Sequence, residues 1–155
     1  MKSLSFLICS FALLLFSCKK ETMLSLEVSH HFYVRNNNVD LPVLVEGNTA
    51  SKTFVVYIHG GPEDGAIAES TNPTFWGKLE ESYAMDYYGQ RGIGMSNGNF
   101  DERALTIEQY VEDLDKILTV LKSRYGSDIG IFLLGGSWED MLELLTLPHQ
   151  TTKQK

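Results

Sequence analysis

The segment that most constrains the fold of this chain is residues 129–138, an apolar run of strand length followed by two glycines, a serine and a tryptophan. A continuous apolar run of this length is typical of a parallel strand buried in a sheet. The abrupt change to Gly135, Gly136 and Ser137 predicts a tight strand-to-helix turn with the serine at its apex, a nucleophile elbow. Such a turn requires small residues two before and two after the serine. Gly135 meets this requirement and Glu139 does not.

The composition indicates a folded, acidic protein. At 155 residues the chain is long enough for one small domain with its own core, and 43% hydrophobic residues are ordinary for a globular protein. The net charge of −7 argues against a nucleic-acid partner, because such a partner requires a clustered basic surface.

The first residues are expected to direct export. Residues 1–17 combine Lys2 with an apolar stretch too short to span a bilayer, as in a signal peptide. Their ending resembles a bacterial lipoprotein signal, in which cleavage leaves Cys18 as a lipidated N-terminus; the alternative is an ordinary secretory signal cut nearby. Cys9 is removed in either case, so no internal disulfide is expected. With residues 18–26 as a tether, the protein would lie in the cell envelope, at the periplasm or outer membrane, anchored by lipid.

The rest of the chain alternates strand patterns with helix patterns. The predicted strands are residues 27–35, 41–46, 53–58, 83–88 and 129–134, and the predicted helices are residues 74–82 and 106–125. The first two strands are predicted to form a hairpin, and the apolar pattern of the third is typical of a strand buried on both faces. Thr106 with Gln109 forms a capping box for the long helix, and Gly126 ends it. This order predicts an α/β fold whose sheet is parallel in its later part.

Two loops that follow predicted strands carry candidate functional residues. Gly60 and Gly61 follow the strand at 53–58, where paired glycines let backbone N–H groups face a ligand oxygen as half of an oxyanion hole. His59 directly precedes these glycines, and we expect it to be a structural hydrogen-bonding residue rather than a catalytic base. The glycine spacing of residues 89–96 matches neither a dinucleotide-binding nor a Walker loop.

Three motifs in this order resemble the proline iminopeptidase family of α/β-hydrolases, and the resemblance covers about residues 27–138. The matching residues are His59, Gly60, Gly61 and Pro62, then Gln90, Arg91, Gly92, Gly94 and Ser96, then Gly135, Ser137 and Trp138. The resemblance implies that Ser137 is the acyl-forming nucleophile. It implies oxyanion donors from Trp138 and from the Gly60–Gly61 turn. The family removes an N-terminal residue, typically proline, from peptides without a metal or cofactor.

The chain departs from the family motifs at three positions before the elbow. Gly89 stands where the family carries an aspartate, and we expect this loss to leave Arg91 without its partner. Asp86 stands at a strand position that is normally apolar, where an unpaired carboxylate is costly. Glu63 replaces a glycine.

The C-terminal residues depart further. Only 18 residues follow Ser137, with His149 as their one histidine, although this fold places its acid and its histidine on later strands. The sequence therefore predicts an incomplete triad, with the lid and amine-binding acids also missing. If the codons after Ser137 encoded Trp-Gly-Gly-Tyr-Ala-Gly, loss of one G would give Trp138 to Glu143 as they stand. We therefore expect residues 139–155 to be a frameshifted, non-native tail.

Truncation also affects the sheet. In this family residues 129–134 lie between the strand at 53–58 and a later strand that this chain does not encode. The expected result is an exposed edge that no charge or proline protects, and therefore a mature chain that is poorly soluble or partly molten.

Three functional interpretations remain open. The first is an inactive N-terminal half, residues 27–138, of an exported proline iminopeptidase-like hydrolase, whose complete form would act on peptides. The second is a general esterase or amidase of the same fold, acting on a small-molecule acyl substrate. The third is a lipid-anchored binding protein without catalysis. An enzyme requires a histidine within hydrogen-bond reach of Ser137, whereas a binding protein requires only a stable surface.

Overall fold

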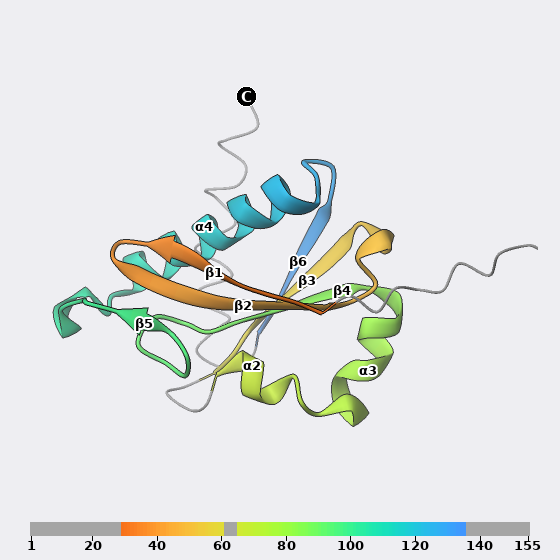
Figure 1. The fold of residues 1–155 in the computed structure, drawn as a ribbon, viewed down its shortest axis with the longest axis horizontal. Coiled ribbons are helices and arrows are strands. Elements are labelled where there is room, and N and C mark those ends of the chain that lie inside the picture. The colour runs from red at the N-terminus through yellow and green to blue at the C-terminus, as the bar shows by residue number, and fades with distance from the viewer. Residues whose placement is uncertain (1–28, 61–64, 136–155) are drawn as a thin grey trace, which may run out of the picture.

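The computed structural model describes residues 29–60 and 65–135, which form a six-stranded sheet with helices on both faces (Figure 1). The strands are β1 (His30–Asn36), β2 (Val39–Gly47), β3 (Thr53–Ile58), β4 (Ala84–Tyr88), β5 (Asn97–Gly98) and β6 (Gly130–Gly135). The helices are α2 (Ala66–Glu69), α3 (Pro73–Ser82) and α4 (Ile107–Tyr125), with short 3₁₀ turns η2 (Thr49–Ser51) and η3 (Glu102–Ala104). No helix in these two ranges is both long enough and apolar enough to cross a membrane.

The predicted hairpin of the first two strands is confirmed. β1 and β2 are antiparallel and joined by Asn37 and Asn38, whose φ angles are 40° and 63°. Two successive residues with positive φ make the type of turn whose twist matches that of the strands, and asparagine tolerates this conformation better than most residues.

The sheet is parallel in its later part, as expected from the alternation of elements. Its order is β1-β2-β4-β3-β6, with β5 paired to β2. β3 is parallel to both β4 and β6, whereas β2 is antiparallel to β4. Among the described residues β6 pairs with β3 alone, so it forms one margin of the sheet.

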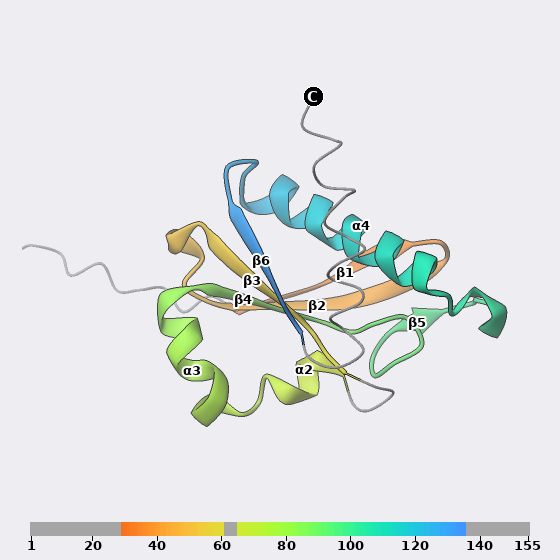
Figure 2. The ribbon, with the colours of Figure 1, turned by 180° about the vertical axis from the view of Figure 1, so that it is seen from behind.

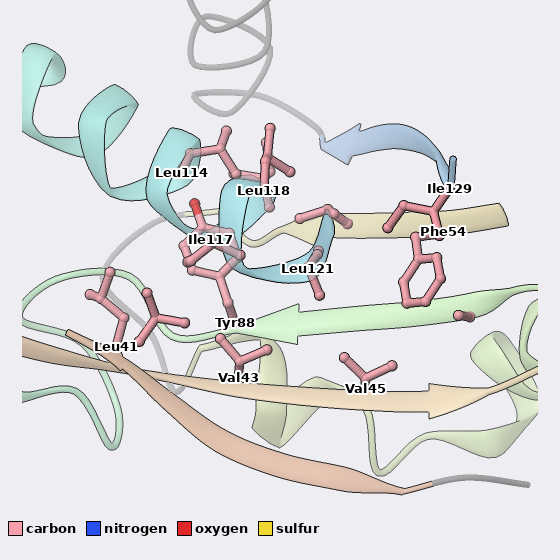
Figure 3. Packing of buried hydrophobic residues seen from close by; sticks show 14 of the residues in the cluster. Leu41, Val43, Val45, Phe54, Tyr88, Leu114, Ile117, Leu118, Leu121 and Ile129 are labelled. Carbon is pink, nitrogen blue, oxygen red and sulfur yellow. The ribbon is translucent and has the colours of Figure 1, made fainter. Parts of the chain in front are cut away.

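Each face of the sheet is covered by different helices (Figures 1 and 2). α4 packs leucine and isoleucine side chains against residues of β2, β3 and β4, as Figure 3 shows. On the opposite face Trp76 of α3 packs with Ala66, Met85 and Tyr87. The two clusters place the core on both sides of β4.

Burial of the strands differs from the prediction in two places. β4, rather than β3, is buried at every position, because α2 and α3 contact β4 while β3 is half-exposed at alternate residues. Residues 129–134 lack the burial that their apolar run alone predicts, since Phe132 and Leu134 are 62% and 38% exposed, which agrees with the expectation of an exposed edge strand. The strand is parallel as predicted, and the face that carries Phe132 and Leu134 is the exposed one.

The long helix begins and ends where its signals indicate. Thr106 caps α4, and its side chain accepts a hydrogen bond from the backbone N–H of Gln109 at 3.3 Å. Only this half of the predicted capping box is seen, because Oε1 of Gln109 accepts a hydrogen bond from the Asn37 side chain instead, at 3.0 Å. Gly126 ends the helix with a φ of 119°.

Candidate functional site

The carboxyl ends of β3, β4 and β6 meet at one edge of the sheet. Ile58, the last residue of β3, is in register with Gly135, the last residue of β6. Ligands of open α/β sheets bind outside this edge. The segments that carry the predicted oxyanion turn and the predicted elbow both leave the sheet here. Gly61, Pro62, Ser137 and Trp138 themselves lie outside the described residues, as do Cys18, Glu63 and the 139–155 tail.

Hydrogen bonds of His59 link the end of β3 to the loop that follows β4. The residue is 1% exposed, and its backbone carbonyl accepts a hydrogen bond from Gln90 Nε2 at 2.8 Å. Its ring Nε2 lies 3.4 Å from the backbone nitrogen of Gln90 and accepts from it. A neutral imidazole that accepts at Nε2 carries its proton on Nδ1. Both contacts hold the residue before Gly60 in a fixed position, which is a structural role.

Arg91 is fully buried and paired with a carboxylate from α4. Its Nε and Nη2 atoms donate to the two oxygens of Asp113 at 2.9 and 2.7 Å. The same guanidinium reaches the backbone carbonyls of Asn36 and Asn37 at 3.4 and 3.5 Å. Asp113 also accepts from the Asn36 side chain at 2.7 Å. The expectation that Arg91 lacks a partner is therefore wrong, because Asp113, a carboxylate 22 residues away in sequence, pairs with it.

Sequence reasoning missed Asp113, although a signal for it exists. Asp113 lies three residues after Tyr110 and four before Ile117, so it falls on the apolar stripe of α4 rather than on its charged face. A lone carboxylate on an otherwise apolar helix stripe requires a buried cation or donor. Arg91 is the residue that meets this requirement.

The loop of residues 89–96 is closed by its own hydrogen bonds. The backbone N–H of Gly92 donates to Ser96 Oγ at 2.8 Å, and the N–H of Ile93 donates to the Gln90 carbonyl at 3.1 Å. Gly92 and Gly94 have φ angles of 78° and 57°, which favour glycine. The motif residues of this loop therefore shape it and attach it to β3, α4 and the hairpin.

Gly89 packs closely against the ring of Pro42. A Cβ atom placed at Gly89 would lie 2.7 Å from Cγ of Pro42, and the Gly89 N–H donates to the Pro42 carbonyl at 2.8 Å. Real Cβ contacts essentially never reach this distance, and the proline ring cannot rotate away. An aspartate at position 89 is therefore incompatible with Pro42 where it stands.

Asp86 is a buried carboxyl group within the sheet. The side chain has no exposed surface, and neither of its oxygens has a hydrogen-bond partner among the described residues. It lies in β4 in register with Val45 of β2 and Val56 of β3. Burial raises the pKa of Asp86 to about 8 because the charged form loses its hydration. The carboxyl group is therefore held largely in its neutral form at pH 7.

An open pocket of about 520 Å³ lies beside the carboxyl end of β6, on the face that α3 covers. Its lining includes Tyr57, Phe75, Trp76, Leu134 and Gly135. The pocket is mainly aromatic and aliphatic, which suits an apolar group. It adjoins the residue directly before the undescribed segment that carries Ser137.

Metal ligands are not grouped in the part of the chain that the structure describes. No set of three histidine, cysteine, aspartate or glutamate side chains there is arranged to hold a metal ion.

No protein-family model matches the sequence, and the comparison with curated proteins finds no match. Solved structures do match. A proline iminopeptidase-related protein from Thermus thermophilus is 23% identical with a TM-score of 0.61, over 78% of this chain and 40% of that protein. An esterase from Pyrococcus furiosus is 21% identical with a TM-score of 0.62, over 77% and 44%. The chain has the α/β-hydrolase fold.

Other structures with the α/β-hydrolase fold are similar to the same extent. The thioesterase domain of the curacin biosynthetic pathway is 16% identical with a TM-score of 0.62, over 81% of this chain and 43% of that domain. This chain spans about two fifths of the length of these proteins. All three identities are below 25%, so the likeness concerns the fold and assigns no activity.

Proposed function

We propose that this chain is the N-terminal part of a serine hydrolase of the proline iminopeptidase type, with Ser137 as its nucleophile. The observation that carries the proposal is the register of Ile58 with Gly135. Adjacent strands lie about 4.8 Å apart, so the carboxyl ends of β3 and β6, which directly precede the segments beginning at His59 and at residue 136, lie side by side. The order of the three motifs supports this subtype over other α/β-hydrolases.

The chemistry follows from this placement. As a base takes its proton, the Ser137 hydroxyl would attack the carbonyl carbon of the substrate and form a tetrahedral oxyanion, which collapses to an acyl-enzyme as the amine leaves with that proton. Water would then hydrolyse the acyl-enzyme and free the serine. Backbone N–H groups of the Gly60–Gly61 turn and of Trp138 would donate to that oxyanion. The Gln90 hydrogen bonds to His59 keep the start of this turn in place.

The attack requires a base, and none of the histidines that the structure describes is placed to act as one. His59 uses Nε2 to accept from Gln90, and His30 and His31 lie on β1 at the opposite margin of the sheet. His149 is the one histidine after Ser137. We therefore expect the chain alone to have no turnover. Residues 139–155 are proposed to be frameshifted sequence, and residues 1–17 a signal that exposes Cys18 for lipidation.

A general esterase or amidase is the second candidate. The observation that favours it is the mainly apolar pocket beside Gly135, because such a pocket accepts an acyl group without reading a peptide N-terminus.

The decisive experiment begins with the coding DNA. We expect resequencing, or insertion of one G after the Trp138 codon, to restore Gly-Gly and open a frame that encodes an acid and a histidine. The restored protein is then assayed on a proline arylamide and on a nitrophenyl ester, beside the present chain and Ser137→Ala variants of both.

Release of proline by the restored protein, lost in Ser137→Ala, supports the peptidase. Serine-dependent hydrolysis of the ester alone supports the second candidate. A restored frame without a histidine contradicts both enzymatic proposals and leaves the binding protein. Serine-dependent turnover by the present chain contradicts the expected inactivity.

A further inference from the structure

The loop between β4 and α4 carries a strand of only two residues, β5, which pairs with β2 directly after the turn of the β1–β2 hairpin (Figure 1). Asn97 is in register with Asp40, and Gly98 is in register with Val39. Both residues of β5 are exposed, so burial in the core does not anchor the strand. A pairing this short, without buried side chains, opens locally at little cost in free energy.

Asn97 stands in a sequence context that favours deamidation. It is the one asparagine of the chain that is followed by glycine. The backbone nitrogen of the next residue can attack the carbonyl carbon of an asparagine side chain and close a five-membered ring. Glycine favours this attack, because it has no Cβ atom to obstruct the approach and its backbone adopts conformations closed to other residues. Gly98 has such a conformation, with a φ of 153°.

We propose that Asn97 is a site of self-catalysed deamidation, and that its conversion detaches β5 from β2. The site combines an exposed asparagine, a following glycine and a strand that opens easily. The reaction takes water as its co-reactant and requires no enzyme, metal or redox partner. The proposal does not depend on the proposed enzymatic function.

The reaction proceeds through a cyclic imide. Hydroxide takes the proton from the backbone nitrogen of Gly98, which then forms a bond to the side-chain carbonyl carbon of Asn97. The bond from that carbon to the amide nitrogen breaks, and the nitrogen takes a proton from water and leaves as ammonia. A second water opens the imide at either carbonyl carbon and yields aspartate or isoaspartate. The net change is one water consumed and one ammonia released.

The aspartate product places two carboxylates opposite each other. Directly opposed residues of antiparallel strands have Cβ atoms about 4.5–5.5 Å apart, and like charges there destabilise the pairing. Asp40, the partner of Asn97 in β2, accepts from Arg35 Nη1 at 2.8 Å on its other side. The new carboxylate at position 97 gains no such donor from β2, so it weakens the pairing of β5.

The isoaspartate product disturbs the backbone itself. Isoaspartate routes the chain through Cβ, which lengthens the backbone by one atom directly before Gly98. Gly98 has no space for this shift, because a Cβ atom placed there would lie 2.7 Å from Cα of Val39 and closer still to the carbonyl oxygen of Asn38. The loop keeps its second link to the hairpin, where Arg91 reaches the Asn36 carbonyl at 3.4 Å. Conversion should therefore loosen β5 without unfolding the protein.

The first test incubates the full-length chain in a mild non-ionic detergent at mildly alkaline pH and follows tryptic peptides by mass spectrometry. Trypsin releases residues 92–103, which contain both Asn97 and Asn99. Asn99 is the internal control, because it is equally exposed but precedes Phe100, whose side chain obstructs the attack. We expect residue 97 to convert at least several-fold faster than residue 99, with both aspartate and isoaspartate among the products.

Three outcomes of this test would overturn the proposal. They are an intact Asn97, equal conversion of Asn99, and aspartate formed without isoaspartate, which would mean direct hydrolysis without the imide. Asn97→Gln provides a variant control, since its ring would have six members and close more slowly. Loss of ammonia from this variant as fast as from the unchanged chain would also contradict ring closure.

The second test measures the effect on the strand pairing. Asn97→Asp reproduces one product, and Asn99→Asp is the matched control that adds the same charge outside β5. We expect hydrogen–deuterium exchange at residues 39, 40, 97 and 98, read by NMR, to become faster in Asn97→Asp only. Adding Asp40→Asn to Asn97→Asp should slow the exchange again, because the opposed like charges are gone. Equal exchange in the two single variants, or no recovery in the double variant, contradicts the proposed detachment.

Discussion

Asp86 places a carboxyl group inside the packed sheet without a hydrogen-bond partner among the described residues. Such a group is retained at a cost, because a protonated carboxyl without partners loses the hydrogen bonds it makes to water. Gly89, three residues later, is the opposite case. The space that a side chain would need there is filled by Pro42, so this departure from the family motif is accommodated by packing.

We predict that Asp86→Val stabilises the protein at neutral pH and removes a pH dependence. The pKa of Asp86 is 3.8 in the unfolded chain and about 8 in the folded one, so the folded state binds the extra proton between these values. The free energy of unfolding therefore falls as pH rises from about 4 to 8, by at most about 1.4 kcal/mol per pH unit. Urea unfolding of both proteins from pH 4 to 9 measures the difference.

Asp128→Val is the control for Asp86→Val. The Asp128 side chain is 74% exposed, so its loss should leave the pH profile of the unchanged protein in place. An Asp86→Val variant that keeps the wild-type slope between pH 4 and 8 would show that another group titrates.

At the scale of elements, the Arg91–Asp113 pair joins three parts of the chain that are distant in sequence. Arg91 belongs to the loop after β4, Asp113 to α4, and the carbonyls of Asn36 and Asn37 to the β1–β2 hairpin. The guanidinium and the carboxylate are each 1% exposed, and both make further hydrogen bonds. A buried pair with this many partners fixes how the elements meet more than it adds to net stability.

We predict that Asp113→Asn lowers the free energy of unfolding by about 3–5 kcal/mol, because it leaves the Arg91 charge buried without a counter-charge. Arg91→Met with Asp113→Leu should recover much of that loss, since both buried charges are then gone. Urea unfolding of the three proteins measures the effect.

The exposed Arg103–Asp101 pair provides the matched control. Its Nη2–Oδ2 distance of 2.6 Å is as short as in the buried pair, but the Arg103 side chain is 90% exposed. Arg103→Met should not shift the urea midpoint measurably, because water screens the pair. A shift equal to that of Asp113→Asn would mean that burial does not decide the cost.

At the scale of the whole molecule, two regions are expected to determine the cellular location of the protein and its contacts with other molecules. The margin at β6 exposes apolar side chains, and the net charge of −7 opposes association without protecting that edge. The N-terminal residues, outside the described ranges, are expected to attach the protein to a membrane through Cys18.

We predict that radiolabelled palmitate enters the expressed protein and is lost in Cys18→Ala, because the acyl chains would be attached at that cysteine. Cys9→Ala is the control and should retain the label, since Cys9 lies within the segment removed. Unchanged labelling of Cys18→Ala would place any lipid elsewhere and remove the basis for a lipid anchor at this site.

The sequence by itself determined the elements whose signals are local. Asn37 and Asn38 specify the hairpin turn, and the apolar repeat with Thr106 and Gly126 specifies α4, because neighbouring residues along the chain decide turns and helix ends. Only the tertiary structure decided which strand is fully buried and that Asp113 is the partner of Arg91. Strand order and a buried ion pair depend on residues far apart in the chain, and no local pattern encodes which of them will meet.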